Sequence, residues 1–154
     1  MLSLSRAKQK MIDVHLRRRG IADEDVLRAM EAVPREFFVD EGFEEFAYED
    51  APLSIGENQT ISQPYIVALM LEKAQIQPDD IVLEIGTGSG YAAAVMSKLA
   101  KFVYTVERHS SLAALAKRRF QEGGYSNIEV RLGDGTKGWP EAGPFSAILV
   151  AAAG

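Results

Sequence analysis

From Asp79 onward, apolar strand-like segments alternate with helical ones, and this alternation constrains the fold more than any other feature of the sequence. A strand, a helix and a further strand in this order are typical of a parallel sheet with right-handed crossovers. The chain is therefore predicted to have an α/β fold with a mostly parallel sheet. The predicted strands are 80–86, 102–107, 128–134 and 145–153, and the predicted helices between them are 91–100 and 111–123.

The first 60 residues have a different character and form a predicted N-terminal helical region. Helical spacing of apolar residues predicts helices within 1–20 and over 22–33, and the second helix is expected to end before Pro34. Residues 35–53 mix aromatic and acidic residues without a clean period, which favours irregular structure whose aromatic side chains pack against the helices.

Composition excludes several classes of function. The 154 residues carry 17 basic and 22 acidic side chains, a net charge of −5, so neither nucleic acid nor an anionic membrane is an expected partner. The absence of cysteine excludes disulfides and thiolate metal sites and suits the cytoplasm. His15 and His109 have no second histidine at ligand spacing, and no metal site is expected.

The turn "LEIGTGSGYAA" joins the first predicted strand to the next helix. Its glycines, Gly86, Gly88 and Gly90, permit positive φ angles and let a ligand approach the backbone. Tyr91 stands where a dinucleotide-binding turn has its third glycine. Glu84 would repel a pyrophosphate but attract a cation, so the turn favours a positively charged nucleoside such as S-adenosylmethionine.

Acidic residues also end the next two strands. Glu107 ends the second strand, where a carboxylate can accept hydrogen bonds from both ribose hydroxyls. Asp134 follows the third strand and could accept from an adenine amino group, while Gly135 leaves room for the ring. Because open α/β sheets bind ligands at the carboxyl ends of their strands, these residues predict one cofactor site.

These motifs resemble those of class I S-adenosylmethionine-dependent methyltransferases, and within that class the protein-L-isoaspartate O-methyltransferase family. The resemblance extends over essentially the whole chain, through "AVPREFFVDEGF", "ENQTISQPYIVALM", "VLEIGTGSGY" and "GDGTKGWPEAGPFSAILVAAAG". It implies a Rossmann-like methyltransferase fold in a single domain. It also implies methylation of the free α-carboxylate of L-isoaspartyl residues in damaged proteins or peptides. The resulting ester collapses to a succinimide, which can reopen to normal aspartate.

The resemblance also implies roles for individual residues. Ser62 matches the family's active-site serine, and Gln59, Thr60 and Ile61 would complete a substrate-binding lip with it. The cofactor would be bound by Glu84, Gly86, Thr87, Gly88, Ser89, Gly90, Glu107, Arg108, Asp134 and Gly135.

Ser62 is expected to position the substrate carboxylate by a hydrogen bond rather than to attack it. A carboxylate is already ionised at neutral pH, so methyl transfer from a sulfonium needs alignment and not a base. Ser62 or Gln63 could instead cap the helix that Pro64 introduces. The sequence leaves open whether the Ser62 hydroxyl bonds the backbone or the substrate.

Members of this family continue beyond the residue that corresponds to Gly154, with a helix and further strands. Residues 1–154 are therefore expected to be one domain, with 1–60 as the N-terminal region and 61–154 as the first part of the core. If the chain ends at Gly154, its last strand becomes an apolar edge that invites homo-oligomers, and cofactor binding and activity should be weak. The alternative is that these residues are a fragment of a longer product.

Two rival functions remain. One is methylation of another acceptor, such as a small molecule or RNA. RNA is disfavoured by the acidic balance and by the basic residues 117–119, which are expected to form a solvated helix face. The other rival is a non-catalytic module that binds the cofactor or another protein.

Overall fold

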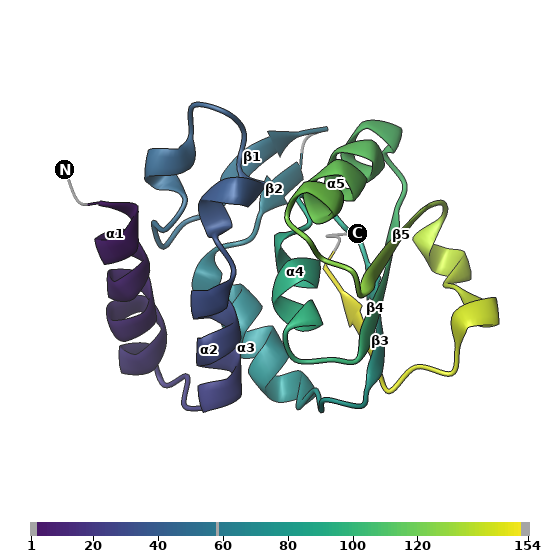
Figure 1. Cartoon of the computed structure of the whole chain (residues 1–154), viewed down its shortest axis with the longest axis horizontal. Coiled ribbons are helices and arrows are strands. Elements are labelled where there is room, and N and C mark those ends of the chain that lie inside the picture. The colour runs from purple at the N-terminus through teal and green to yellow at the C-terminus, as the bar shows by residue number, and fades with distance from the viewer. Residues whose placement is uncertain (1–2, 58, 152–154) are drawn as a thin grey trace. The chain divides into compact units, whose positions relative to one another are not determined.

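The computed structural model describes residues 3–57 and 59–151 (Figure 1). It forms two compact units, Met1–Gln75 and Ile76–Gly154. The single domain with parts 1–60 and 61–154 remains a prediction. The last predicted strand extends to 153, and its end lies outside the described residues.

Helices dominate the N-terminal unit. Ser3 begins the first helix by accepting a hydrogen bond from the Arg6 backbone N–H, and Asp23 caps a later helix at the N–H groups of Asp25 and Val26. Among the described helices, none has the length and apolar character needed to cross a bilayer. The helical elements are α1 (Leu4–Lys10), η1 (Met11–Leu16), η2 (Arg17–Arg19), α2 (Glu24–Ala32), η3 (Arg35–Phe38), η4 (Glu44–Phe46) and α3 (Pro64–Ala74).

The segment expected to be irregular contains two short 3-10 helices, η3 and η4. Phe38 and Tyr48 are buried, as expected for aromatic residues that pack against helices. Phe43 and Phe46 differ, because their side chains are 51% and 37% exposed and their rings lie 6.4 Å apart. The expectation therefore holds for only part of the aromatic set.

A small antiparallel hairpin follows this segment, and the sequence did not predict it. Its strands are β1 (Leu53–Gly56) and β2 (Gln59–Ile61), with Leu53 opposite Ile61. Within the hairpin, Ile55 and Ile61 are buried. The hairpin leads directly into α3.

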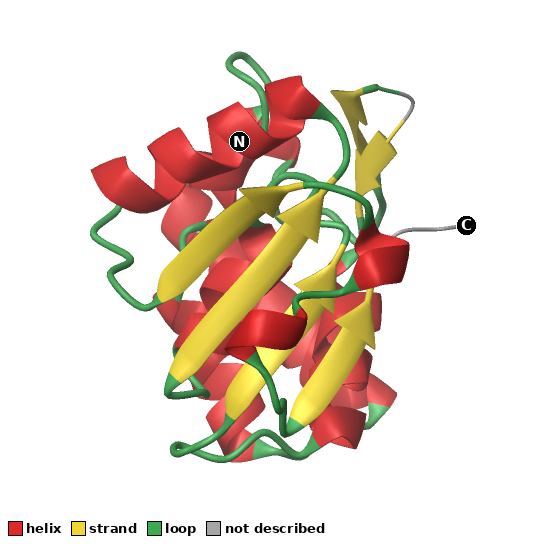
Figure 2. Cartoon of the chain, turned by 90° about the vertical axis from the view of Figure 1, so that its right-hand side faces the viewer, coloured by secondary structure: helices red, strands yellow, loops and turns green. Residues whose placement is uncertain are grey.

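The C-terminal unit confirms the predicted α/β fold. Its four strands are parallel and lie in the order β5–β4–β3–β6 (Figure 2). They are β3 (Ile81–Ile85), β4 (Phe102–Glu107), β5 (Ile128–Leu132) and β6 (Ala147–Val150). The helices are α4 (Tyr91–Ser97), α5 (Ser110–Glu122), η5 (Gly135–Lys137) and η6 (Pro140–Ala142).

Both faces of this sheet are partly covered. Figure 1 shows α4 and α5 on one side of the strands and the short helices η5 and η6 on the other. On the η side, Trp139 packs with Leu83 and Val106, and Phe145 extends the cluster. This packing holds the segment after β5 against the sheet and so places the loop that begins with Asp134.

Strand β6 lies at one end of the sheet. It pairs with β3, and no strand within residues 3–57 and 59–151 pairs with its outer edge. Ile148 and Val150 are 60% and 64% exposed. The described part of the chain therefore presents the apolar edge strand that was expected.

Candidate functional site

The glycine-rich turn follows β3 directly and has the backbone geometry expected of it. Gly86, Gly88 and Gly90 have φ angles of 95°, 55° and 94°, in the left-handed region that side chains with a Cβ rarely adopt. The backbone N–H groups of Gly86 and Thr87 both donate to the Val106 carbonyl, at 2.8 and 3.3 Å. The turn is thus tied to β4 at its start and leads into α4.

Glu107 holds the same turn with its side chain. One carboxylate oxygen accepts the Gly88 N–H and the other accepts the His109 N–H, each at 2.9 Å. The residue is 4% exposed. Each carboxylate oxygen can accept a further hydrogen bond, so Glu107 can hold the turn and still receive a ribose hydroxyl.

Glu84, which was expected to attract a cation, has no exposed surface in this structure. Its side chain is fully buried, Oε1 accepts from the Thr105 hydroxyl at 2.7 Å, and Oε2 has no hydrogen-bond partner among the described residues. Burial raises the pKa of Glu84 to about 8, the nearby Glu107 adds to that rise, and the Thr105 hydrogen bond opposes it. At neutral pH Glu84 is therefore mostly an uncharged acid in this structure, because the protein interior disfavours its charge.

Two buried residues that the sequence analysis did not select also reach the turn. The Thr105 hydroxyl lies 2.6 Å from that of Thr87, and Arg119 Nη1 donates to the Ser89 carbonyl at 2.8 Å. Ser89 Oγ in turn accepts the Tyr91 N–H. The turn is therefore fixed from β4 and from α5.

Arg119 corrects the interpretation of residues 117–119 as a solvated face. Lys117 and Arg118 are exposed, but Arg119 is only 7% exposed. A signal was present in the sequence, because position 119 falls on the apolar stripe of α5 at helical spacing. The buried residues of that helix are Leu112, Ala113, Ala116, Arg119 and Phe120.

The loop after β5 holds the predicted adenine contacts. Asp134 is exposed and is the N-cap residue of η5, and its Oδ1 accepts from the backbone N–H and the hydroxyl of Thr136 at 2.9 and 2.7 Å. These hydrogen bonds keep the pKa of Asp134 below its ordinary value. A Cβ at Gly135 would lie 2.4 Å from Ile85 Cγ2, so glycine is needed there for packing on β3. Arg108 is exposed.

The predicted lip lies in the N-terminal unit. Thr60 is exposed and Gln59 is half-buried on β2, but Ile61 is 3% exposed and its side chain is part of the core. The N-cap residue of α3 is Gln63, and no side chain caps this helix. The Ser62 hydroxyl is therefore not used as a helix cap.

A buried arginine holds the Ser62 backbone. Arg35 is fully buried, its Nη2 donates to the Ser62 carbonyl at 2.7 Å, and its Nε donates to the Ala47 carbonyl at 2.5 Å. Its backbone N–H donates to the Tyr48 hydroxyl, which donates to Glu36. The motif "PREFF" therefore fixes the loop that presents Ser62, which sequence reasoning did not anticipate.

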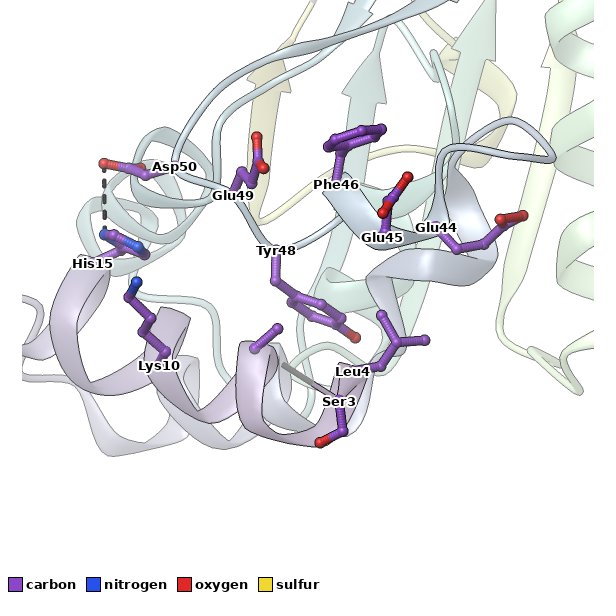
Figure 3. A pocket seen from close by; sticks show the side chains of 11 residues that line it. Ser3, Leu4, Lys10, His15, Glu44, Glu45, Phe46, Tyr48, Glu49 and Asp50 are labelled. Atoms are coloured by element: carbon purple, nitrogen blue, oxygen red, sulfur yellow. Dashed lines mark ion pairs between the residues drawn. The ribbon is translucent and has the colours of Figure 1, made fainter. Parts of the chain in front are cut away.

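The N-terminal unit also contains a pocket of about 630 Å³ between α1 and the segment 44–50 (Figure 3). Leu4, Phe46 and Tyr48 contribute to its lining, and His15 lies 3.9 Å from Asp50 at its edge. None of the residues predicted to bind substrate or cofactor lines it. Within residues 3–57 and 59–151, no three His, Cys, Asp or Glu side chains are grouped to hold a metal ion.

Comparison with known proteins gives consistent matches. The family model "Protein-L-isoaspartate(D-aspartate) O-methyltransferase (PCMT)" matches residues 6–154. A protein-L-isoaspartate O-methyltransferase of Pelotomaculum thermopropionicum is 57% identical over 145 residues, which are 94% of this chain and 63% of that protein. The chain thus spans less than two thirds of this relative's length.

Solved structures agree with these sequence matches. A protein-L-isoaspartate O-methyltransferase superposes with a TM-score of 0.85 at 33% identity, over 93% of this chain and 47% of the other. A Plasmodium falciparum structure assigned to the same enzyme, in complex with S-adenosyl-L-homocysteine, has a TM-score of 0.74 at 27% identity. That match covers 93% of this chain and 72% of the other.

Proposed function

This chain belongs to the protein-L-isoaspartate(D-aspartate) O-methyltransferase family, and we propose that the protein methylates the free α-carboxylate of L-isoaspartyl residues in damaged proteins or peptides. The methyl donor is S-adenosylmethionine. The observation that carries the proposal is the glycine-rich turn, whose backbone is tied to Glu107 on the neighbouring strand. The comparisons support it, since one similar structure holds S-adenosyl-L-homocysteine.

The residues of the C-terminal unit fit such a cofactor. Glu107 has acceptor positions left for ribose hydroxyls, and the buried Oε2 of Glu84 still lacks a partner among the described residues. Gly86 to Gly90 allow close approach to the backbone, and Asp134 can accept from an adenine amino group. When bound, the cofactor supplies an electrophilic methyl group on a sulfonium.

The lip residues act on the substrate. An α-carboxylate has an ordinary pKa of about 3.3–3.7, so it is ionised at neutral pH and needs no base to become a nucleophile. Ser62 donates a hydrogen bond to one carboxylate oxygen and orients the other for attack. Alignment of this kind supplies up to about 7–11 kcal/mol of a reaction barrier.

The composition of the chain and its exposed apolar residues support a proposed location and proposed partners. The cytoplasm is the proposed location, in keeping with a chain that has no cysteine. Nucleic acid is not a proposed partner, because the net charge is −5. Self-association through the outer edge of β6 is consistent with the exposure of Ile148 and Val150.

The test offers labelled S-adenosylmethionine with an isoaspartyl peptide and, separately, with the matching aspartyl peptide. Base-labile label on the first peptide alone is the expected result, and equal label on both would contradict the substrate assignment. Cofactor binding without any label would instead support a non-catalytic module. Ser62→Ala should lower the rate, while Ser54→Ala, on the exposed side of β1, should not.

A further inference from the structure

A chain of buried hydroxyl groups connects the sheet to the glycine-rich turn. Thr105 stands opposite Glu84 in the register of β4 and β3, and it is fully buried. Its hydroxyl donates to Glu84 Oε1 at 2.7 Å and lies 2.6 Å from the hydroxyl of Thr87, which is 3% exposed. One side chain on β4 therefore contacts both an acid of β3 and the turn.

The direction of this chain follows from the number of hydrogens. A hydroxyl has one hydrogen to donate, and Thr105 gives it to Glu84. When Glu84 Oε1 is the acceptor of that hydrogen bond, either as a deprotonated carboxylate or as the carbonyl oxygen of the acid, Thr87 donates to Thr105 and its hydrogen points into the protein. Toward the side of a ligand, Thr87 offers lone pairs, which accept hydrogen bonds from groups such as an ammonium or a ribose hydroxyl.

We propose that Thr105 is a positioning residue for the cofactor, because it fixes the Thr87 side chain in the turn and the Glu84 carboxyl beneath it. This inference rests on the proposed function. The backbone anchors at the Val106 carbonyl hold the start of the turn, but they do not orient the Thr87 hydroxyl. Thr105 provides that orientation.

The surroundings of Glu84 make this contact measurable. Glu107 is the charged neighbour that raises its pKa, and burial contributes more. In the same unit, Tyr91 is the only titratable residue of α4, and Arg119 of α5 donates to the Ser89 carbonyl. On β6, the apolar Leu149 lies opposite Glu84. The Thr105 hydrogen bond lowers the pKa of Glu84, so its removal must raise that pKa further.

The experiment compares two substitutions of Thr105. Thr105→Val keeps the shape and removes the hydroxyl, whereas Thr105→Ser keeps the hydroxyl. Calorimetry with S-adenosyl-L-homocysteine should show binding about 5- to 10-fold weaker for the valine variant, as expected for one lost hydrogen bond. The serine variant should stay within about twofold of wild type. The ¹³C titration of the Glu84 carboxyl should move to higher pH in the valine variant alone.

Ser97→Ala is the matched control. Ser97 is a buried hydroxyl of the same unit that donates to the Ala94 carbonyl at 2.6 Å, within α4. Its removal should leave binding unchanged. If Ser97→Ala weakened binding as much as Thr105→Val, the effect would be one of general stability and the inference would be wrong.

A second variant keeps the inference testable if Thr105→Val does not fold. Thr87→Val removes the other end of the contact, and it should weaken binding without moving the Glu84 titration. The double variant Thr105→Val, Thr87→Val should lose less affinity than the sum of the two single losses, because both substitutions remove the contact between the two hydroxyls. If Thr105→Val or Thr87→Val bound S-adenosyl-L-homocysteine as tightly as wild type, the inference would be wrong, but the proposed function would not be affected. A wild-type protein that binds no S-adenosyl-L-homocysteine would overturn the proposed function as well.

Discussion

Two neighbouring arginines on α5 show how strongly the position of a residue determines its role. Arg118 is exposed and lies 3.9 Å from Glu122 in an ion pair on the surface. Arg119 is buried and donates to the Ser89 carbonyl in the glycine-rich turn. The two side chains have the same chemistry, but only the second replaces water as the partner of a buried carbonyl.

Arg119→Met should therefore destabilise the C-terminal unit by about 1–3 kcal/mol, because it leaves the Ser89 carbonyl without this donor. Arg118→Met removes the same group from the surface and should change stability by no more than about 0.5 kcal/mol. Chemical denaturation of both variants measures the difference. Equal effects would mean that the Arg119 hydrogen bond contributes nothing to stability.

Single residues are also where sequence reasoning was weakest. Gly86 and Glu107 could be selected because glycine spacing and strand ends are visible in the sequence. The contact between Thr105 and Thr87 could not be found, because it depends on strand register and on the fold of the turn. Ile61 looked like a lip residue from its motif, but its side chain is buried.

At the scale of elements, the segment after β5 is held by close packing on β3. A Cβ at Gly135 would lie 2.4 Å from Ile85 Cγ2, whereas a Cβ at Gly133 would meet nothing within 4 Å. Gly135→Ala should cost about 1–3 kcal/mol through overpacking, and Gly133→Ala should have a small effect. Thermal or chemical unfolding of the two variants provides the comparison.

A double substitution tests the cause of that cost. In Ile85→Ala the contacting Cγ2 is absent, so adding Gly135→Ala to this background should be less costly than in wild type. Additive costs in the double variant would show that Ile85 is not the obstacle.

The four parallel strands and the helices between them could be predicted because their apolar periods are long and clear. The hairpin of β1 and β2 could not, since strands of four and three residues with mixed polarity carry little periodic signal. Helix α4 ends at Ser97, earlier than predicted, because the Lys98 and Leu99 N–H groups bond three residues back and tighten the last turn.

For the whole molecule, the buried Glu84 makes stability depend on pH. Its pKa is raised from an ordinary 4.5 to about 8, so between these values the folded state holds a proton that the unfolded state has lost. Stability should therefore fall as pH rises through that window, by up to about 1.4 kcal/mol per pH unit. Glu84→Gln should flatten this dependence.

Glu122→Gln is the control, because Glu122 is exposed on α5. The free energy of unfolding of both variants is measured by denaturation from pH 5 to pH 8, at intervals of about one pH unit. The same steep fall in Glu84→Gln as in wild type would assign the pH dependence to another group.

In the loop before α3, the backbone of Ser62 has a structural role, whereas its hydroxyl group has none among the described residues. The Ser62 carbonyl is held by Arg35, but its hydroxyl does not cap the helix. In a cell, substitutions of Ser62 that keep the backbone should therefore leave the amount of protein unchanged and reduce only the proposed methyl transfer. Substitutions of Arg35 should reduce both, so abundance measured beside activity distinguishes the residue proposed to orient the substrate from the residue that holds its backbone in place.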